Sequence, residues 1–587
     1  METARFFDGG NGCLSPQSVY NRRMSETQFY PPESGIYYGL DRPAAEEWGG
    51  RLPVALVFPG PSRLGLSTLG WQVVWKLLQD EPGIIVERFF WEGGDEEPRA
   101  YDSGRPLSDF PVISFSLNFE EEYRAMVQML DRANIPVRSA DRGDWPIIIA
   151  GGPLSFMNPA PVAPAVDLFW VGEAEAGFPK IISDCVDYVF GGKSRADYLA
   201  DHVGMDGAYI PGLSKDPVRR VLAGSERELP EPGHSCFVTQ ESEFRDMFLL
   251  EVNRGCPYGC RFCAAGYVYR PPRHAQVDVL KRAVERVNPG KVGLVGTALT
   301  DWPDLMPFLH WLQDRGTKFS LASLRYDGLT DDMLTFLRRT GTRSVTLALE
   351  GASHRIRKAI NKNLKEDVFL DAVSRISKLQ FNHLKLYLIA GWPDETEADY
   401  DELGEFLKEI RAAIDAGKGK KKTGVGHVTI GVSSLVPKPW TPFQWAPMAT
   451  EEHLNKVMKK LKSVVKPIKG FQVRVDKPAP ARLQGLLARG DEKVFDLIEM
   501  SACQGLSWKK ALRAWDGDMS AYLDRERGAD EAFPWECIET GVNRSFLRRE
   551  WERYKAVQAS PLCGKAPCKK CNACGMGSWL YDRPEKD

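Results

Sequence analysis

Three cysteines lie close together in the middle of the chain, with a spacing suited to a reactive metal centre. Cys256 and Cys260 are separated by three residues, and Cys260 and Cys263 by two. Four thiolates would saturate an iron–sulfur cluster or a zinc ion, whereas three leave one coordination position open for another ligand. Gly255 and Gly259 let the backbone curl around such a centre. The spacing predicts an iron–sulfur cluster with one open iron; a zinc knuckle or three buried thiols is the alternative.

Four further cysteines form a second set near the end of the sequence. They are Cys563, Cys568, Cys571 and Cys574, spaced by four, two and two residues. Four thiolates close the coordination shell of a metal, so a structural zinc ion and a second [4Fe-4S] cluster both fit, and the spacing does not distinguish them. A second cluster could relay electrons or bind substrate, whereas zinc would only hold the tail in place.

The composition describes a large globular protein of near-neutral charge. The 587 residues are 43% hydrophobic and 27% charged, with a formal net charge of -2, which excludes a wholly disordered chain and gives no long-range attraction for polyanions. The N-terminal segment has no apolar core, and nowhere do 18 apolar residues follow one another. We therefore expect a cytoplasmic protein without a membrane span. Seven of the twelve cysteines fall in the two sets, which favours metal ligation over disulfides.

The first half of the chain predicts a doubly wound α/β domain. Residues 1–50 are rich in Gly, Pro, Ser and Tyr and predict an extension. Over 51–195, short apolar runs alternate with amphipathic segments of helical length, which is typical of buried parallel strands in βαβ units. The runs are PVALVFP, IIVERFFW, VISFSLNF, WPIIIAGGP and DLFWVGEAEAG. In such a Rossmann-like domain ligands bind at the carboxyl ends of the strands.

The second half predicts a barrel followed by helices. Residues 196–245 carry many Pro and Gly and predict a linker. Six apolar runs over 246–464 alternate with helical stretches, which predicts a (β/α)6-type partial TIM barrel with parallel strands. Those runs are MFLLEVN, KVGLVG, KFSLASL, SVTLALE, LKLYLIAG and HVTIGVSSLVP. Residues 465–587 predict a mainly helical region with a cysteine-rich tail. The first cysteine set follows the first barrel strand, where active-site loops of such folds lie.

The spacing of the first cysteine set, with an aromatic residue before the last cysteine, resembles the radical S-adenosylmethionine (SAM) superfamily. The resemblance implies a [4Fe-4S] cluster whose free iron binds SAM and cleaves it to a 5'-deoxyadenosyl radical. It also implies SAM contacts at the ends of the later barrel strands, although each could instead be an ordinary turn or salt bridge. The expected SAM contacts are Gly296, Thr297, Ser323, Arg325, Glu350 and Gly391.

A wider resemblance covers most of residues 51–574. The motifs VFPGPSRLGLSTLGWQ, IIIAGGPLSFMNP, VGEAEAG, RGCPYGCRFCAAGYVYRPPR, KLYLIAGWPDET and SSLVPKPWTPFQWAPM together resemble bacterial radical SAM proteins with an N-terminal cobalamin-binding-like domain. The first loop is not GxGxxG, so a nicotinamide cofactor is disfavoured. No Asp-x-His-x-x-Gly loop occurs among the eight histidines, so a bound cobalamin would lack that axial ligand. A domain that kept the fold and lost the ligand is the alternative.

The resemblance and the glycine-rich loops together give a set of expected cobalamin contacts. They are Leu66, Ser67, Gly70, Gly151, Gly152 and Glu173.

Three functions are compatible with these features. The first is a cobalamin-dependent radical SAM methyltransferase acting on an unactivated carbon. The second is a radical SAM enzyme that catalyses a rearrangement, a cyclisation or a sulfur insertion. The third is an RNA- or ribosome-associated binding module, which the near-neutral charge disfavours. The expected partners are a small-molecule, peptide or RNA substrate and a reducing protein such as flavodoxin or ferredoxin.

Overall fold

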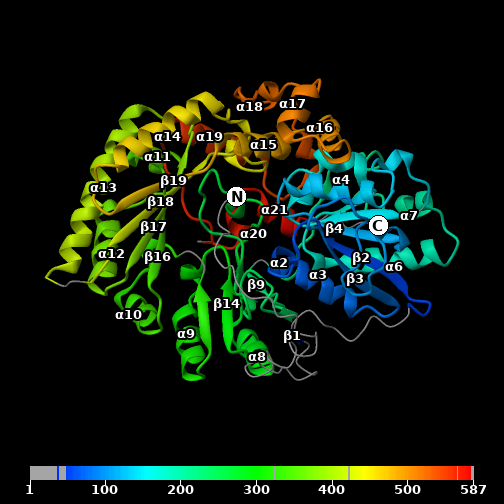
Figure 1. The fold of residues 1–587 in the computed structure, drawn as a ribbon, viewed down its shortest axis with the longest axis horizontal. Coiled ribbons are helices and arrows are strands. Elements are labelled where there is room, and N and C mark those ends of the chain that lie inside the picture. The colour runs from blue at the N-terminus through cyan, green and yellow to red at the C-terminus, as the bar shows by residue number, and fades with distance from the viewer. Residues whose placement is uncertain are drawn as a thin grey trace, which may run out of the picture.

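The structure is a computed structural model that describes residues 36–38, 48–144, 146–225, 227–321, 324–420, 423–564 and 566–582. Two lobes, each built on parallel β-sheet, lie side by side, and helices of the C-terminal region run across the top of both (Figure 1). Two short helices near the end of the chain, α20 (Cys568–Cys571) and α21 (Met576–Tyr581), lie between the lobes. The last part of the sequence therefore returns to the junction of the first two domains.

The N-terminal lobe contains a six-stranded sheet in the order β3-β2-β4-β5-β6-β7, parallel except for β7. The strand order reverses between β2 and β4, which is where ligands bind in doubly wound sheets. Every residue of β2 is buried, as expected for a parallel strand covered on both faces. The strands are β2 (Leu52–Phe58), β3 (Ile84–Phe90), β4 (Val112–Ser116), β5 (Ile147–Gly151), β6 (Leu168–Trp170) and β7 (Ala208–Tyr209).

Helices cover both faces of this sheet. On one face Trp71, Trp75 and Ile181 pack against β2 and neighbouring strands. On the other face Met126 belongs to a core that continues into Leu497 of the C-terminal region, so the two regions share one hydrophobic cluster. The helices of this lobe are α2 (Ser62–Gly65), α3 (Leu69–Gln79), α4 (Glu122–Arg132), α5 (Pro153–Met157), α6 (Phe178–Val189) and α7 (Arg195–Asp201).

The second lobe is an open barrel made of two parallel sheets, β11-β14-β15 and β16-β17-β18-β19. The residues of β16 and β17 alternate between buried and accessible, because helices cover the outer face and the inner face stays open. The strands are β11 (Phe248–Glu251), β14 (Lys291–Val295), β15 (Lys318–Leu321), β16 (Ser344–Glu350), β17 (His383–Ala390), β18 (His427–Ser434) and β19 (Phe471–Val475).

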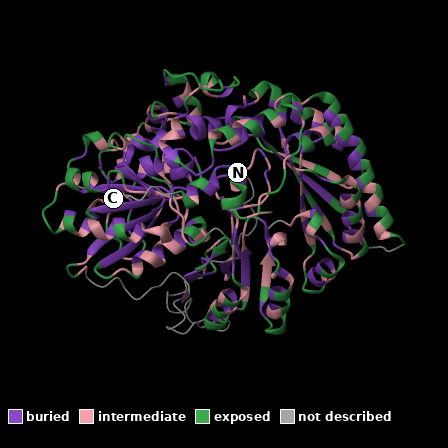
Figure 2. Cartoon of the chain, turned by 180° about the vertical axis from the view of Figure 1, so that it is seen from behind, coloured by how far each residue is buried: buried purple, intermediate pink, exposed green. Residues whose placement is uncertain are grey.

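The helices between the barrel strands form the outer layer, whose outward faces are exposed (Figure 2). Several begin at a side-chain cap: Thr396 and Asp399 form a capping box at the start of α13, and the Thr330 hydroxyl accepts a hydrogen bond from the Met333 amide at the start of α10. The helices are α8 (Val277–Val287), α9 (Leu305–Asp314), α10 (Asp331–Arg339), α11 (His354–Ala359), α12 (Glu366–Lys378), α13 (Glu397–Lys418) and α14 (Glu451–Val465).

The C-terminal region is mainly helical, as predicted, but it also contributes strands. β19 adds a parallel strand to the barrel beside β18, and β20 (Ile538–Glu539) pairs with β8 (Val218–Arg219). Alternating half-buried and exposed positions in a short strand such as FQVRV are easily mistaken for part of a charged helical stretch. The helices are α15 (Pro478–Arg489), α16 (Val494–Cys503), α17 (Trp508–Ala514), α18 (Met519–Leu523) and α19 (Arg544–Lys555), followed by α20 and α21.

The stretch 196–245, expected as a linker, is folded onto both lobes. It contains α7, the last strand β7 of the N-terminal sheet, and short strands that join other parts of the chain. Within this stretch, β10 (Phe237–Val238) pairs with β1 (Tyr37–Tyr38) near the N-terminus. β9 (Glu228–Leu229) pairs with β13 (Arg273–Ala275) of the barrel lobe, and β13 in turn pairs with β12 (Asn253–Arg254). The predicted α/β class, with a doubly wound N-terminal sheet and a partial barrel, is confirmed.

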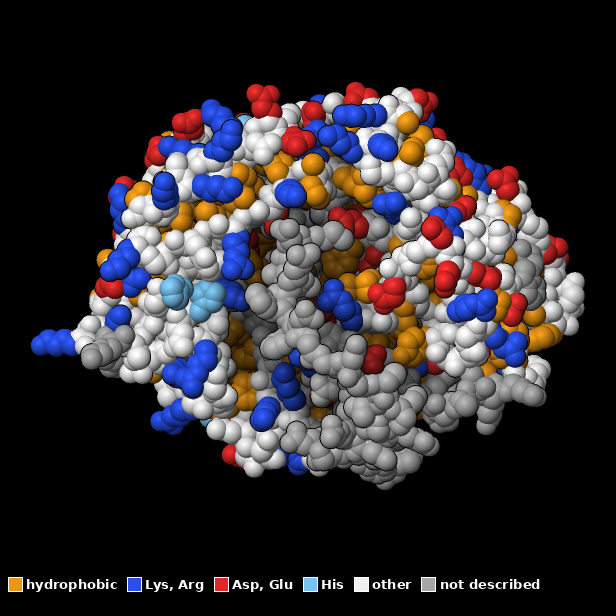
Figure 3. Space-filling model, in the orientation of Figure 1, with side chains coloured by type: hydrophobic (Ala, Val, Ile, Leu, Met, Phe, Trp, Pro, Cys, Tyr) orange, Lys and Arg blue, Asp and Glu red, His pale blue; other side chains and the backbone are white. Residues whose placement is uncertain are grey.

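The surface agrees with the near-neutral charge. On the face drawn in Figure 3, basic and acidic side chains both occur on each lobe, and hydrophobic side chains are visible in the hollow between the lobes. Among the described helices, none combines the length and the apolar character needed to cross a membrane.

Candidate active site

The loop that carries Cys256, Cys260 and Cys263, here called the first cysteine set, is wound too tightly for side chains at its glycines. Gly255 has a φ of +83°, and a Cβ there would collide with the Tyr269 carbonyl. A Cβ on Gly266 would collide with the Tyr258 carbonyl. Glycine is required at such positions because it alone lacks the Cβ. The loop follows β11 at the carboxyl end of the barrel, as predicted.

The thiols of the first cysteine set lie in a poorly solvated place. Burial raises the pKa of Cys256 to about 11 and that of Cys263 to about 12, and it also raises the pKa of Cys260. A metal must therefore displace the protons to bind here. Within the described residues, no three His, Cys, Asp or Glu side chains are drawn together tightly enough for a single metal ion. The case for a cluster rests on the number, order and surroundings of the thiols.

Two side chains from outside the loop and one from within it brace its backbone. The Gly259 carbonyl accepts hydrogen bonds from the Tyr267 hydroxyl and the Asn361 amide, both at 3.1 Å. Arg261 is fully buried, forms an ion pair with Glu550 at 3.1 Å and donates to backbone and hydroxyl oxygens just before the C-terminal cysteines. The loop is thus anchored to the barrel and to the C-terminal region at once, which limits its freedom to rearrange.

The predicted SAM contacts Gly296 and Thr297 lie directly beside this loop. The Thr297 amide donates to Asn253 Oδ1 at 2.8 Å, and the Thr297 hydroxyl donates to the Gly255 carbonyl. A Cβ on Gly296 would lie 2.5 Å from Asn253 Oδ1. Asn253 thereby joins the ends of β11 and β14. Asn253 was not among the predicted SAM contacts, although it lies in the segment that leads into Cys256.

The other predicted SAM contacts are more scattered. Arg325 stacks on the Tyr258 ring, 3.5 Å from its centroid, and forms an ion pair with Asp327 at 2.7 Å. Glu350 has a φ of +64° and faces Lys362 at 3.5 Å, and its charge acts on the Cys260 thiol. The Gly391 amide donates to the Glu395 carboxylate, so this amide is already satisfied.

Ser323 lies outside the described residues. Its contact with SAM, like those of Arg325, Glu350 and Gly391, stays a prediction.

A cavity of about 460 Å³ lies between the carboxyl end of the N-terminal sheet and the carboxyl ends of the barrel strands β11 and β14. Its size is within the range of ligand-binding cavities, roughly 300–1,000 Å³. From the N-terminal lobe it is lined by the predicted contacts Gly70, Gly151, Gly152 and Glu173, together with strand-end residues of β2, β4 and β6. From the barrel it is lined by Gly255, Gly296, Thr297 and neighbours. Predicted cobalamin contacts of the N-terminal lobe and the predicted SAM contacts Gly296 and Thr297 of the barrel therefore line the same cavity. We call it the junction cavity.

Two predicted cobalamin contacts do not line the junction cavity. The Leu66 side chain, at the end of α2, is buried in the hydrophobic cluster that also contains Trp71 and Trp75. Ser67 donates to the Arg63 carbonyl and accepts from the Glu243 amide at the outer surface. The glycine-rich loop was correctly placed at the strand ends, but the sequence does not reveal which side of the turn faces the cavity.

Glu173 lines the junction cavity through an ion-pair network. Its carboxylate pairs with Arg254 at 3.0 Å and with Arg273, and accepts a hydrogen bond from the Ala223 amide at 2.8 Å. Burial raises the pKa of Glu173, but the hydrogen bond from Arg273 and the charges of Arg254 and Arg273 outweigh it and hold the pKa at about 2. Both oxygens are occupied, so the residue organises the cavity wall.

Arg254 connects the two lobes immediately before the first cysteine set. Its guanidinium pairs with Glu173 and Glu175 of the N-terminal lobe, at 3.0 and 2.9 Å, and with Glu251 of the barrel at 2.9 Å. Arginine suits this role because its planar fork donates several hydrogen bonds in fixed directions. The network fixes the distance between the N-terminal sheet and the cysteine loop.

Comparison with known families decides the class of chemistry. Residues 250–407 match the model of the radical SAM superfamily, and this range runs from the end of β11 into α13 and includes the first cysteine set. This chain is a radical SAM enzyme. Residues 70–211 match the model described as the N-terminal region of radical SAM proteins. The family implies that the radical SAM enzyme uses a [4Fe-4S] cluster and SAM, in agreement with three thiols on a tightly wound barrel loop.

Similar proteins span a range of chemistry. An uncharacterised protein of Methanocaldococcus jannaschii, MJ0966, is 29% identical over 462 residues, which cover 76% of this radical SAM enzyme and 91% of the relative. A tRNA-2-methylthio-N(6)-dimethylallyladenosine synthase of Clostridium botulinum is 28% identical over 178 residues, 27% of this chain and 39% of the relative. The solved structure of the radical SAM methyltransferase TsrM from Kitasatospora setae is 12% identical, with 79% of this chain and 99% of that chain covered and a TM-score of 0.47.

Proposed function

We propose that this radical SAM enzyme is a cobalamin-dependent methyltransferase that acts on an unactivated carbon. In this proposal the first cysteine set holds the [4Fe-4S] cluster, and cobalamin and SAM occupy opposite walls of the junction cavity. The single observation that carries the proposal is that the carboxyl-end loops of the doubly wound sheet and the residues next to the cysteine loop line the same cavity. A cofactor held by one domain would thus face a cofactor held by the other.

The N-terminal side of the cavity would suit a flat cofactor. Gly70, Gly151 and Gly152 contribute bare backbone to this wall, and Gly152, at a φ of +97°, has no room for a Cβ, which would collide with the Leu117 carbonyl. Phe156 and Tyr269 also line the cavity and pack edge to face at 5.6 Å, which provides an apolar surface. Among the lining residues there is no histidine, so the protein would present no imidazole to the lower face of a corrin.

On the barrel side of the cavity, protein side chains would position SAM relative to the cluster and to the N-terminal wall. Asn253 and Thr297 hold the ends of β11 and β14 together, which would keep SAM at the open iron of the cluster. The Arg254 network would hold the N-terminal wall at a fixed distance from that iron. When bound, SAM and the cluster would supply a carbon-centred radical, and methylcobalamin would supply the methyl group. The walls of the cavity would keep water away from both.

The proposal is tested by anaerobic reconstitution with iron, sulfide and hydroxocobalamin. After gel filtration we expect about one cobalamin per chain, and after addition of reductant and SAM we expect 5'-deoxyadenosine. Retention of iron without any cobalamin would overturn the methyltransferase proposal and leave the radical SAM assignment standing. Once the reductant has converted the retained hydroxocobalamin to cob(I)alamin, methyl-labelled SAM should also methylate it. The visible spectrum of the corrin follows the formation of methylcobalamin, and mass spectrometry follows the label.

Sulfur insertion is a second candidate function. It is supported by the partial similarity to a tRNA methylthiotransferase and by the four C-terminal cysteines, which lie beside the first cysteine set. If this candidate is correct, iron-bound sulfide will be consumed during turnover and appear in the product. Reconstitution with labelled sulfide followed by mass spectrometry of the product separates it from methyl transfer.

A further inference from the structure

The four cysteines Cys563, Cys568, Cys571 and Cys574, here called the second cysteine set, lie against the loop of the first set. The Cys563 amide donates to the Pro257 carbonyl at 2.9 Å, and Pro257 follows Cys256 directly. A second link runs through Asn361, whose amide donates to the Gly259 carbonyl and whose oxygen accepts from the Ser560 amide at 2.8 Å. Two metal centres bound at the two sets would therefore be neighbours.

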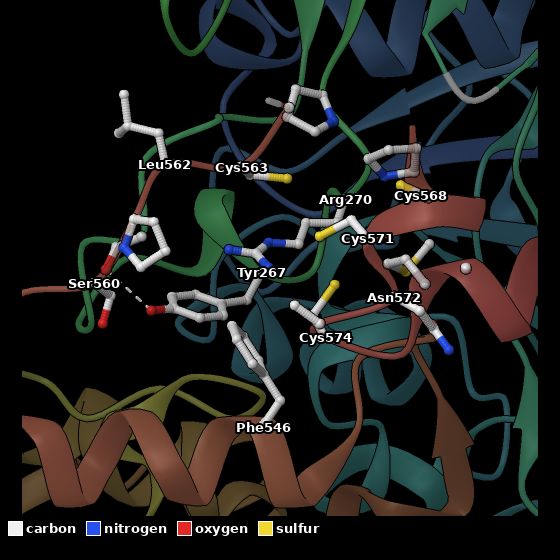
Figure 4. A pocket seen from close by; sticks show the side chains of 18 of the residues that line it. Tyr267, Arg270, Phe546, Ser560, Leu562, Cys563, Cys568, Cys571, Asn572 and Cys574 are labelled. Atoms are coloured by element: carbon white, nitrogen blue, oxygen red, sulfur yellow. Dashed lines mark hydrogen bonds between the residues drawn. The ribbon is translucent and has the colours of Figure 1, made fainter. Parts of the chain in front are cut away.

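The second cysteine set lines one side of a common cavity. All four cysteines line a cavity of about 250 Å³, and Figure 4 shows their sulfur atoms around this space together with Arg270. A zinc ion would need its four sulfurs about 2.3 Å away, whereas no three His, Cys, Asp or Glu side chains among the described residues are grouped closely enough for a single metal ion. A [4Fe-4S] cubane spreads its ligand sulfurs apart, because four irons and four sulfides lie between them.

The charge of this cavity suits an anionic cluster. Arg270 is buried, its Nε donates to the Gly266 carbonyl at 2.6 Å, and its charge acts on Cys574 and Cys563. Gly266 belongs to the turn that follows Cys263, so Arg270 connects the two cysteine sets. Arg549 and Arg553 also line the cavity.

A cluster with four thiolates carries net negative charge, which these guanidinium groups would stabilise. Glu550 is the only carboxylate among the lining residues, and it is already paired with Arg261 and Arg553.

We infer that the second cysteine set holds a second [4Fe-4S] cluster and that this cluster delivers electrons to the first. This inference goes beyond the proposed methyl transfer and does not depend on cobalamin. Four cysteine ligands leave no open iron, which suits electron transfer and not substrate binding. Cys571 and the neighbouring Lys569 and Lys570 of α20 are exposed, so an acidic one-electron donor protein of the flavodoxin or ferredoxin class can approach this side.

In this relay the donor protein would give one electron to the second cluster, which would change from the 2+ to the 1+ state. The second cluster would return to 2+ as it reduced the first cluster from 2+ to 1+. The first cluster would return to 2+ on giving this electron to SAM, whose carbon–sulfur bond would break into methionine and the 5'-deoxyadenosyl radical.

Metal analysis tests the identity of the second site. In the anaerobically reconstituted full chain we expect about eight irons and eight sulfides, as two cubanes require. The double variant Cys568→Ser/Cys571→Ser should lose about half of both and keep the SAM-sensitive paramagnetic signal of the first cluster, which also shows that the variant is folded. The matched control Cys503→Ser/Cys537→Ser changes two isolated thiols and should keep all iron. One zinc per chain at the second set, or unchanged iron in the double variant, would overturn the inference.

Reduction kinetics test the relay. With a flavodoxin-class donor, reduction of the first cluster should slow by tenfold or more in the double variant, whereas reduction by dithionite should change less than twofold. Equal rates with the protein donor would overturn the relay.

Arg270 offers a finer test of the charge argument. Arg270→Met removes a buried positive charge and should make the second cluster harder to reduce, and Arg270→Lys should restore most of its potential. An unchanged potential in Arg270→Met would contradict the placement of the cluster beside this residue.

Discussion

The two cysteine sets are held by the protein in different ways, although a few hydrogen bonds connect them. The first set lies on a loop where glycine is sterically required at Gly255, which also lines the junction cavity, and the loop contains the fully buried Arg261. The second set lies on a tail of short helices, where Cys574 is buried and Cys571 is exposed. A centre with three ligands on a rigid loop suits reaction with a bound molecule. A centre with four ligands near the surface suits the entry of electrons.

The largest effect is expected from the loss of a first-set ligand. Cys260→Ala should reduce 5'-deoxyadenosine formation by more than about 100-fold, because removal of a ligand damages a cluster more than removal of an outer hydrogen bond, which already costs 10–100-fold. Anaerobic turnover with excess reductant and quantification of 5'-deoxyadenosine measure this. Cys503→Ala, an isolated thiol, serves as the control. Activity of Cys260→Ala close to that of the control would show that the first set is not the reactive centre.

The next effect concerns the junction cavity. Gly70 lines the cavity, and a Cβ there would meet nothing within 4 Å, so Gly70→Phe should place a ring in the cavity without disturbing the fold. We expect retention of cobalamin to fall by about tenfold or more, while reductive cleavage of SAM changes by less than about twofold.

Gly143→Phe, at an exposed glycine with equally free surroundings outside the cavity, is the matched control. Equal cobalamin binding by the two variants would place the cofactor elsewhere. The cobalamin retained by each variant is measured by its absorbance after gel filtration.

A smaller effect is expected from the ion pairs between the lobes. Glu173→Gln should lower the free energy of unfolding by about 3–5 kcal/mol, because it leaves two arginines without their shared carboxylate. The ordinary pKa of this carboxyl, 4.5, is lowered to about 2 in the folded protein, so folding is favoured by its ionised form. That stabilisation is complete above about pH 4.5 and is lost as the pH falls towards 2.

Urea denaturation at several pH values tests this expectation. The wild type should lose on the order of 3 kcal/mol more than Glu173→Gln across that acidic window. Parallel pH profiles for the two proteins would contradict the assigned ion pairs.

The smallest effect is expected at Thr297. Thr297→Val removes the hydrogen bond to the Gly255 carbonyl and should weaken SAM binding to the reconstituted protein by about fivefold, equivalent to about 1 kcal/mol. Thr297→Ser keeps the hydroxyl and should bind SAM nearly as well as the wild type. Equilibrium binding of SAM, followed by the spectrum of the cluster, gives both constants. Weaker binding by Thr297→Ser than by Thr297→Val would contradict the role given to the hydroxyl.

Much of the fold follows from local patterns. Continuous apolar runs such as that of β2 predict buried parallel strands, and all six predicted barrel strands are present. β19 was not predicted, because its five residues alternate in a charged region and gain their pairing only from β18, which lies far away in the sequence. The stretch 196–245 has the composition of a linker, yet it forms strands wherever a distant partner supplies the hydrogen bonds.

The site was predictable where chemistry depends on residue type and spacing, and less so where it depends on orientation. The cysteine spacing identified the loop without knowledge of the fold. Gly70 and Gly152 line the cavity as expected, but the neighbouring Leu66 points into the core. Arg254 is the first residue of the motif RGCPYGCRFC, but its bridging role was not predicted, because its three carboxylate partners come together only when the two lobes pack.

The central claim is that the junction cavity holds cobalamin next to the radical SAM cluster. It is tested most directly by diffraction from crystals of the protein reconstituted with iron, sulfide and cobalamin, recorded at the cobalt and iron absorption edges. We predict one cobalt site in the cavity lined by Gly70, Gly152 and Thr297, and an iron cluster at the first cysteine set beside it. Iron at the first cysteine set with no cobalt in the cavity would contradict the account.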